Sequence, residues 1–357
     1  MLASCQPEAP LPVLRIGHAP HDHHAPLYVA ALNPSYFEQN GKIYLKEIQP
    51  FKIYELISNE RAIALVEIDS STGGKELIRK LAENHFDLSF GGVPAMLNFI
   101  DQDYDIKILT PVMSEGAGLV VRKNMPVTNW PEFISFAKLS DKPVKIGYKV
   151  DISVQNLIFE RALAEENIVL SRELSGSGAQ IVVTNLYGAK NLIPALENKL
   201  IDGFVVMQPF ISQAEIRGSG KMISTLSQMP PKGQWVGHPC CALAGNKAYI
   251  AKHQAVVEDM ATLMLRANEF LNRFPDKSAS QVAQWLNTSP EVELRSMPTI
   301  RFIPGKNEAW NKGMAFWVDS MIDQGIINGK VKQAFLAGSL DSLIYDEQIY
   351  SKAREKK

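Results

Sequence analysis

The sequence predicts an α/β protein that folds into two lobes. Short apolar runs alternate with helical patterns between residue 13 and about residue 116, and the alternation begins again at residue 144. This alternation is typical of parallel sheets covered by helices, so two blocks of it predict two sheets. The length of 357 residues agrees, because a single hydrophobic core rarely extends so far.

In the first block, residues 13–17 form an apolar run that predicts a strand, and a helix is expected from Pro26. Proline suits the first turn of a helix because its φ is already helical and its missing N–H is not needed there. Asn33 and Pro34 are expected to cap and restart this helix. The later elements of the block are expected as strands at 64–68, 86–90, 106–109 and 118–121, and as helices from residues 73 and 91.

The second block repeats this pattern, and a helical region follows it. The second block has expected strands at 144–148, 181–183 and 202–206, and expected helices from a cap at 151–153 to about 166 and at 192–199. Further on, a strand is expected at 240–244 and helices at 252–274, 277–287, 308–323 and 330–336. The first of these helices has apolar residues at 256, 257, 260, 263, 264 and 265, which predicts a buried face.

Composition argues against several classes of protein. A net charge of −1 gives no reason to expect nucleic acid or an acidic membrane surface as a partner. No apolar run reaches the length of a membrane-spanning helix. Three cysteines are too few for a disulfide scaffold.

Residues 1–12 are interpreted as a tether before the first strand. Leu2-Ala3-Ser4-Cys5 matches the end of a bacterial lipoprotein signal, where small residues precede a cysteine that is lipidated after cleavage. The charged and apolar regions of such a signal are absent upstream, so we expect the sequence to start just before the cleavage site. A four-residue match also arises by chance. The hypothesis takes Cys5 as a lipid anchor and the proline-rich residues after it as a flexible linker.

Four of the seven histidines lie in a loop between the first strand and the first helix. They are His18, His21, His23 and His24. The carboxyl end of a strand is where open α/β sheets bind ligands, and the following helix N-terminus adds free N–H groups. We therefore expect this histidine loop, residues 17–26, to be part of a binding site.

Three interpretations of the histidine loop stay open. His21, His23 and His24 can bind a divalent metal ion such as zinc, nickel or copper, with Asp22 adding an oxygen. The rings can instead form the hydrogen-bonding wall of a pocket for an organic ligand, since imidazole both donates and accepts. The third interpretation is a solvated polar loop that binds nothing.

Several segments, in order along the chain, resemble the solute-binding proteins of bacterial ABC importers, in the branch of the taurine, alkanesulfonate, nitrate and thiamine-pyrimidine binders. The matching segments are 24–30 with 36–41, 81–95, 195–203 with Gln208-Pro209, and 238–243. Each motif is weak alone, and the resemblance rests on their order and spacing. It implies the two-lobe periplasmic-binding-protein type II fold, with hinged closure on a small molecule between the lobes.

The resemblance also implies how the molecule is organised. Lobe 1 would contain residues 13–116 and 238–357, and lobe 2 residues 117–237. The protein would be a monomer that delivers its ligand to the transmembrane subunits of an ABC importer. It would be lipid-anchored in the periplasm or at the outer face of the cytoplasmic membrane. It would not be an enzyme, and it would need no cofactor apart from the metal ion considered above.

By position, the resemblance implies that both lobes contact the ligand. Lobe 1 would contribute His18, His21, Asp22, His23, His24, Gly92, Val93, Ser114 and Glu115, and lobe 2 would contribute Ser153, Gln208 and Phe210. Ser153 is explained equally well as a helix cap, and a phenylalanine such as Phe210 is more often a core residue than part of a ligand site. Trp235 would line the mouth of the cleft or pack at the surface.

The identity of the ligand stays open. A four-histidine loop is not expected in a sulfonate or nitrate binder, and lobe 2 has no clear arginine pair for an anion. The preferred ligand is a small polar organic compound, such as a thiamine-pyrimidine precursor or an organic anion.

Metal binding and catalysis remain the alternative functions. A related branch of this fold forms the thiamine pyrimidine enzymatically, using iron near a cysteine-rich motif. Here that motif is reduced to Cys240 and Cys241. As neighbours in a strand they should point to opposite faces, so they are not expected to share one metal ion with His238.

Overall fold

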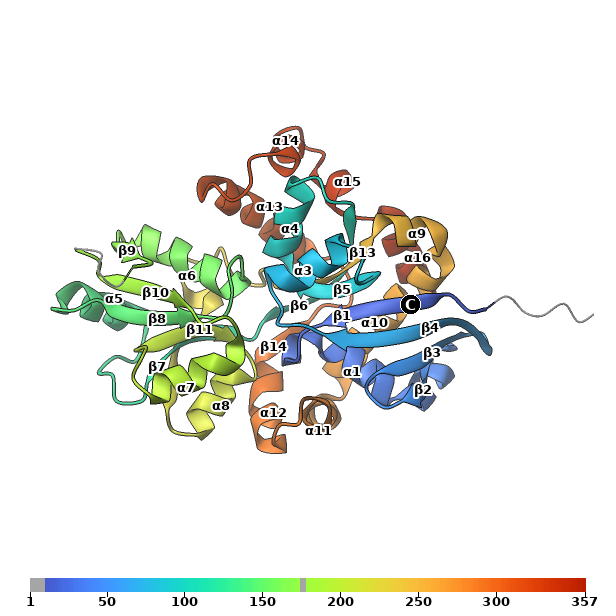
Figure 1. Ribbon diagram of the computed structural model, residues 1–357, viewed down its shortest axis with the longest axis horizontal. Coiled ribbons are helices and arrows are strands. Elements are labelled where there is room, and N and C mark those ends of the chain that lie inside the picture. The colour runs from blue at the N-terminus through green and yellow to red at the C-terminus, as the bar shows by residue number, and fades with distance from the viewer. Residues whose placement is uncertain (1–9, 174–177) are drawn as a thin grey trace, which may run out of the picture.

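The structure, a computed structural model, describes residues 10–173 and 178–357, so Cys5 and most of the expected tether lie outside the described residues. Two sheets organise these residues (Figure 1). The larger has eight strands in the order β14-β6-β13-β5-β1-β4-β3-β2, and the smaller has six in the order β12-β7-β11-β8-β10-β9. The two-lobe α/β prediction is therefore confirmed. We call the larger sheet with its helices lobe 1 and the smaller sheet with its helices lobe 2.

The sheet of lobe 1 is parallel at its centre. β1 pairs in parallel with β4 and with β5, whereas β13 runs antiparallel to its neighbours β5 and β6. The sequence-based prediction did not include the hairpin of β2 and β3 at one edge of the sheet. Only the first half of β2 alternates between buried and less buried residues, so the strand lacks the regular pattern that would have indicated it. The strands are β1 Val13–His18, β2 Ile43–Gln49, β3 Ile53–Ser58, β4 Arg61–Ser70, β5 Leu88–Gly92, β6 Ile106–Glu115, β13 Cys241–Asn246 and β14 Ile300–Phe302.

The sheet of lobe 2 is also mixed. β8 pairs in parallel with β10 and β11, and β7 joins β11 antiparallel. All five residues of β11 are buried, as expected for a strand that is covered on both faces of its sheet. The strands are β7 Ala117–Arg122, β8 Val144–Tyr148, β9 Leu170–Ser171, β10 Ile181–Asn185, β11 Gly203–Met207 and β12 Gly220–Thr225.

Helices cover both sheets. In lobe 1 they are α1 Ala25–Leu32, α2 Pro34–Gln39, α3 Lys75–Ala82, α4 Val93–Asp101, α9 Lys247–Lys252, α10 Gln254–Arg273, α11 Pro275–Leu286, α12 Pro290–Ser296, α13 Glu308–Asp323, α14 Lys330–Leu336, α15 Leu340–Ile344 and α16 Glu347–Lys356. In lobe 2 they are α5 Trp130–Leu139, α6 Val154–Glu165, α7 Leu192–Glu197 and α8 Phe210–Ile216. The apolar stripe predicted for α10 is buried along its length. The side chain of Asn33 does not cap α2, because its amide oxygen accepts a hydrogen bond from Nε2 of Gln281 instead.

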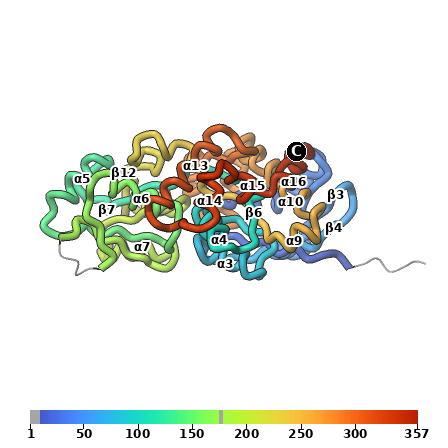
Figure 2. The backbone as a smooth tube through the Cα atoms, turned by 90° about the horizontal axis from the view of Figure 1, so that it is seen from above, coloured from blue at the N-terminus to red at the C-terminus, as the bar shows by residue number. Residues whose placement is uncertain are grey.

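The two lobes lie side by side along the long axis of the molecule (Figures 1 and 2). The chain passes from lobe 1 to lobe 2 at Gly116, between β6 and β7. Within residues 10–173 and 178–357, two ion pairs join the lobes: Arg161 of α6 with Asp323 of α13 at 2.9 Å, and Arg295 of α12 with Glu215 of α8 at 2.8 Å. The lobes are therefore in contact, in a closed arrangement.

In the described part of the chain, no helix combines the length and the apolar character that crossing a membrane requires.

Candidate functional site

A small cavity of about 20 Å³ lies between the lobes, where the expected binding cleft should be. It has room for about one water molecule. The carboxyl ends of β1, β5 and β8 converge on it, which is the edge where open α/β sheets bind ligands. The residues that line it are His21, His23, His24, Gly74, Gly91, Gly92, Lys149, Ile152, Ser153, Val154, Gln155, Cys240 and Cys241.

The histidine loop is buried, so the interpretation as a solvated loop is wrong. Residues 22–24 form one 3-10 turn, and Pro26 then begins α1 as predicted. The exposed fractions of His18, His21, His23 and His24 are 5%, 4%, 1% and 1%. Burial lowers the pKa of His21 well below its usual value and also lowers that of His24.

Two members of the loop point away from the cavity. Nδ1 of His18 lies 3.1 Å from the hydroxyl of Tyr28, and burial lowers the pKa of His18 to about 3. Asp22 accepts a hydrogen bond from Ser296, and its pKa is raised well above the usual range by burial and by the nearby Glu293. Asp22 therefore does not add an oxygen to the histidine cluster, contrary to the metal-site expectation.

His23 faces two cysteines rather than two histidines. Its Nδ1 lies 3.5 Å from Sγ of Cys240 and 3.9 Å from Sγ of Cys241. Among the described residues, these three form the group whose possible metal-ligand atoms all lie within 4.8 Å of one another. His21 and His24 do not belong to that group, so the three predicted histidines do not converge on one point.

The expectation that Cys240 and Cys241 point apart is also wrong. Their Sγ atoms lie 4.0 Å from each other, and both thiols are free and buried. The alternation rule fails here because β13 begins only at Cys241, and its register with β6 shifts directly after that residue. Hydrogen bonding within the pair lowers the pKa of Cys241 and raises that of Cys240.

Lys149 completes the cavity from the lobe 2 side. It is buried, and its Nζ contacts Sδ of Met207 at 3.5 Å. No carboxylate pairs with it within the described residues; burial lowers its pKa, and the nearby thiols of Cys241 and Cys240 act in the opposite direction. A buried lysine without a carboxylate partner is costly, so such groups are typical of ligand-binding sites. Nδ1 of His21 and Oε1 of Gln155 are likewise buried in the cavity wall without a hydrogen-bond partner.

The remaining predicted residues divide between the cavity and its surroundings. Gly92 lines the cavity, and Ser153 lines it while also capping α6 through the N–H of Asn156. Val93 lies beside it, since its N–H donates to the carbonyl of Cys240. The hydroxyl of Ser114 is buried without a partner.

Three residues that were expected at the ligand cleft have partners within the protein. Glu115 accepts a hydrogen bond from the backbone N–H of Gly237, and the side-chain oxygen of Gln208 accepts one from the N–H of Ser212 in α8. Trp235 is fully buried against Phe316 and Trp317, so it does not line a cleft mouth.

A second hollow, which we call the outer groove, adjoins the cavity at His21. It has a volume of about 350 Å³, and both lobes line it. Phe210 is one of its walls, as is the strongly exposed Tyr187 of lobe 2. The lining residues are Ala19, Pro20, His21, Ser70, Ser71, Thr72, Tyr187, Gly188, Ala189, Lys190, Met207 and Phe210.

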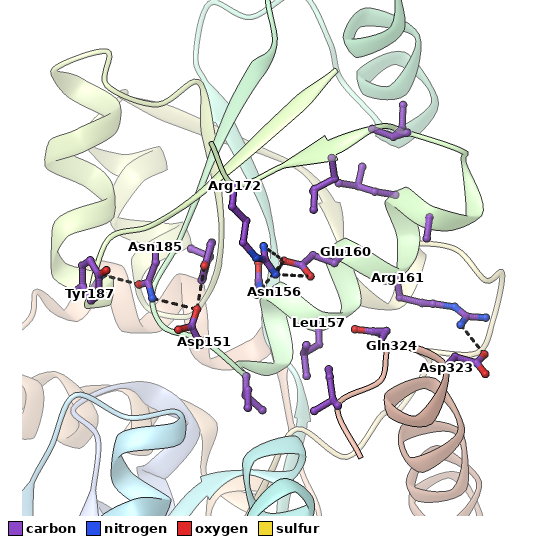
Figure 3. A pocket seen from close by; sticks show the side chains of 17 residues that line it. Asp151, Asn156, Leu157, Glu160, Arg161, Arg172, Asn185, Tyr187, Asp323 and Gln324 are labelled. Carbon is purple, nitrogen blue, oxygen red and sulfur yellow. Dashed lines mark hydrogen bonds and ion pairs between the residues drawn. The ribbon is translucent and has the colours of Figure 1, made fainter. Parts of the chain in front are cut away.

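A larger hollow, of about 750 Å³, lies on the surface beside α6 (Figure 3). Its charged side chains already pair with one another. Arg172 pairs with Glu160, and Arg161 pairs with Asp323. Because both arginines of this groove have carboxylate partners whereas Lys149 of the smaller cavity has none within the described residues, we take the smaller cavity as the candidate functional site.

Lys149 and Gln155 are the residues of this candidate site that the sequence reasoning missed. Lys149 directly follows β8, so its place at the carboxyl end of a strand was the available signal. Gln155 lies in the first turn of α6, after the cap that was predicted at Ser153.

Comparison with solved structures shows which fold this is. The chain is similar to a zinc-bound ligand-binding component of an ABC-type import system from Staphylococcus aureus, at 15% identity and TM-score 0.71, over 96% of this chain and 99% of that one. It is similar to the nitrate-binding protein NrtA from Synechocystis PCC 6803, at 14% identity and TM-score 0.71, over 97% and 89%. It is also similar to the MOPS-bound alkanesulfonate-binding protein SsuA from Xanthomonas axonopodis pv. citri, at 17% identity and TM-score 0.64, over 90% and 96%.

At these identities the likeness is one of fold, and the fold is that of the periplasmic binding proteins, as the sequence predicted. The sequence itself gives the family, because residues 7–287 match the model of the NMT1-like family. That match extends over both lobes and includes the histidine loop, Lys149 and the cysteine pair. The chain therefore belongs to the NMT1-like family.

Proposed function

We propose that this chain is the extracytoplasmic solute-binding protein of an ABC importer, and that its lobes close on a small polar organic solute. The family, the fold and the similar import-system proteins support this role. Those proteins are named as binding proteins or ligand-binding components, and we propose binding rather than catalysis here.

The observation on which the proposal rests is that Lys149 is buried in the wall between the lobes without a carboxylate partner within the described residues. An ammonium group that is buried without a carboxylate is stabilised when a ligand brings negative charge to it. The unpartnered Nδ1 of His21 and Oε1 of Gln155 lie in the same wall and offer hydrogen bonds to a polar ligand. Closure around such a ligand would satisfy all three groups at once.

The outer groove supports an organic solute. Its volume of about 350 Å³ is within the usual range of small-molecule sites, and Tyr187 and Phe210 offer aromatic surface. A ring-containing anion, such as a thiamine-pyrimidine precursor, would place its ring in the groove and its charged group near His21 and Lys149. An alkanesulfonate or another organic anion is the alternative of the same chemical type.

The cellular setting follows from the same proposal. We propose that the protein acts as a monomer outside the cytoplasmic membrane and delivers its solute to the transmembrane subunits of the importer. Lipidation of Cys5 would hold it there.

The test measures bound solute and closure. Native mass spectrometry of the purified protein, compared with its denatured mass, would reveal a solute that copurifies. A panel of a thiamine-pyrimidine precursor, taurine, an alkanesulfonate and nitrate would then be tested by thermal unfolding and small-angle scattering. We expect one of them to raise the melting temperature and reduce the radius of gyration.

A matched pair of lysine variants gives the control. Lys149→Met should abolish both responses, whereas Lys145→Met, an exposed residue of the same strand β8, should keep them. A protein without copurified solute, whose melting temperature and radius of gyration stay constant across the panel, would contradict the proposal.

A further inference from the structure

We propose that lobe 1 contains a site for one thiophilic d¹⁰ metal ion, Zn²⁺ or Cu⁺, formed by Nδ1 of His23 and the Sγ atoms of Cys240 and Cys241. This inference deepens the proposed solute-binding function and rests on it only for the identity of the last ligand of the ion. The remaining coordination position of the ion would take a donor atom of the solute or a water molecule.

The spacing of the three atoms fits a metal ion. They form a triangle with sides of 3.5, 3.9 and 4.0 Å. The point equidistant from its corners is about 2.2 Å from each atom, which compares with roughly 2.3 Å for a zinc–thiolate bond and roughly 2.0–2.1 Å for a zinc–imidazole bond. An ion at or slightly out of this plane would make three normal bonds without movement of the backbone.

The orientation of His23 is fixed in the way a ligand requires. Its Nε2 lies 3.1 Å from the carbonyl oxygen of Gly116, and because a carbonyl only accepts, the proton of the neutral ring belongs on Nε2. Nδ1 then keeps its lone pair and points it at the two sulfur atoms. Metal-binding histidines are typically held by such a bond from the other ring nitrogen to a backbone carbonyl.

Gly116 is itself built into this arrangement. Its φ is +66°, and a Cβ atom there would lie 2.5 Å from Cγ1 of Ile300 and 3.1 Å from Nε2 of His23. The carbonyl that orients the ring is therefore supplied by a turn that only glycine fits.

The ligand set selects the class of ion. Two thiolates and one imidazole favour zinc or copper(I), whereas magnesium and calcium require oxygen ligands. Both cysteines are free and buried, so no disulfide within the described residues competes for them.

All three ligands belong to lobe 1, and this sets the order of events. The ion would bind to the open protein, and lobe 2 would then bring Lys149 and Gln155 over it from the other side of the cavity. The space of about 20 Å³ beside the ligands leaves one coordination position for a water molecule or a donor atom of the solute.

The experiment uses the full chain, reduced and freed of metal under anaerobic conditions so that the vicinal cysteines stay thiols. Cobalt(II) is added first as a spectroscopic probe, followed by Zn²⁺ as a competitor, and Cu⁺ is titrated separately against a copper(I) chelator. We expect thiolate-to-cobalt charge-transfer absorption that saturates at one ion per chain and is displaced by zinc. Elemental analysis of the zinc-loaded and copper-loaded proteins then shows which ion the site retains.

Variants test the ligand set. Cys240→Ser, Cys241→Ser and His23→Ala should each weaken zinc or copper binding by about 100-fold or more, which is at least the loss caused by removing a supporting residue. Cys5→Ser is the matched control for removing a cysteine that does not belong to the proposed ligand set, and His21→Ala is the control for a cavity histidine that is not a ligand. Both controls should bind the ion as the unchanged protein does.

Two results would overturn the proposal. One is a folded, reduced protein in which cobalt gives no thiolate charge-transfer absorption. The other is zinc binding that is lost in His21→Ala and kept in both serine variants. If a variant fails to fold, X-ray absorption of the zinc-loaded unchanged protein decides the matter, because the proposal requires two sulfur and one or two lighter ligands. Either result leaves the proposed function intact, because closure on a solute is measured separately by thermal unfolding and small-angle scattering.

Discussion

Gly92 of lobe 1 lies directly against Val154 of lobe 2, so that a Cβ atom on residue 92 would come within 3.4 Å of Cγ2 of Val154. Gly92 ends β5 and Val154 begins α6, and both line the cavity between the lobes. A Cβ alone would make an ordinary van der Waals contact at this distance, so the atoms beyond it in a larger side chain are the ones that would meet Val154. Its φ of −69° is accessible to any residue, so a larger side chain there tests closure and not backbone strain.

The first prediction concerns this contact. Gly92→Val should act as a wedge that holds the lobes apart and weakens solute binding by about tenfold or more, a cost of roughly 1.4 kcal/mol. Calorimetric titration with the solute and small-angle scattering would measure the effect. Adding Val154→Ala should restore part of the affinity, because it removes the atoms that the wedge meets. Equal affinity in Gly92→Val and the unchanged protein would show that closure does not bring these residues together.

The second prediction concerns the two ion pairs that join the lobes. Asp323→Asn and Glu215→Gln each remove the carboxylate from one pair, with Arg161 and Arg295 respectively. Since such exposed pairs contribute about 0–1 kcal/mol, each change should weaken solute affinity by roughly fivefold or less and enlarge the ligand-free protein slightly. Glu308→Gln, which breaks the pair with Lys312 within α13, should leave affinity and radius of gyration unchanged.

The third prediction is that acid destabilises the protein through His18. The pKa of His18 in the folded protein is lowered to about 3 by burial, whereas that of the unfolded chain is near 6.5. Between these values the unfolded state binds the proton and the folded state does not, so stability falls as the pH decreases from 6.5 toward 3. Denaturant unfolding between pH 7 and 4 should therefore show a loss of a few kcal/mol.

His18→Gln should reduce this acid sensitivity, because glutamine does not titrate. His85→Gln changes an exposed histidine and should leave the pH dependence as it is. A His18→Gln variant that loses stability with the same slope as the unchanged protein would refute the assignment.

The fourth prediction separates stability from binding at Lys149. Lys149→Met should raise the free energy of unfolding of the ligand-free protein by roughly 1–4 kcal/mol, because it replaces a buried ammonium group that lacks a carboxylate partner with an apolar side chain of similar length. The same change should abolish solute-induced closure. Lys145→Met, in the same strand but exposed, should change neither quantity by more than about 0.5 kcal/mol. Loss of stability in Lys149→Met would mean that the ammonium group has a structural partner.

Local pattern was sufficient for most of the fold. The apolar stripe of α10, the proline that begins α1 and the cap at Ser153 are set by neighbours within one or two turns, so spacing alone located them. The β2–β3 hairpin was not predicted, because only the first half of β2 alternates between buried and less buried residues. The alternation rule also misplaced Cys240, which precedes the regular part of its strand.

The contacts within the candidate site could not be predicted from local pattern. The histidine loop was identified from its position after the first strand, but its burial and its split orientation depend on what packs over it. His18 turns to Tyr28, Asp22 to Ser296, and His23 to a cysteine 217 positions away in the chain. Lys149 follows a strand in the other lobe, and nothing near it in the sequence marks it as unpaired.

The sequence by itself therefore determined the two α/β blocks, the family and the loop on which the site is built, because periodicity, caps and motif order are local properties. The tertiary structure decided which side chains meet. The distances from His23 to Cys240, Cys241 and Gly116, and the position of Lys149 across the cavity, depend on packing between strands and lobes far apart in the chain. Directional contacts of this kind arise only when the two sheets are folded and brought together.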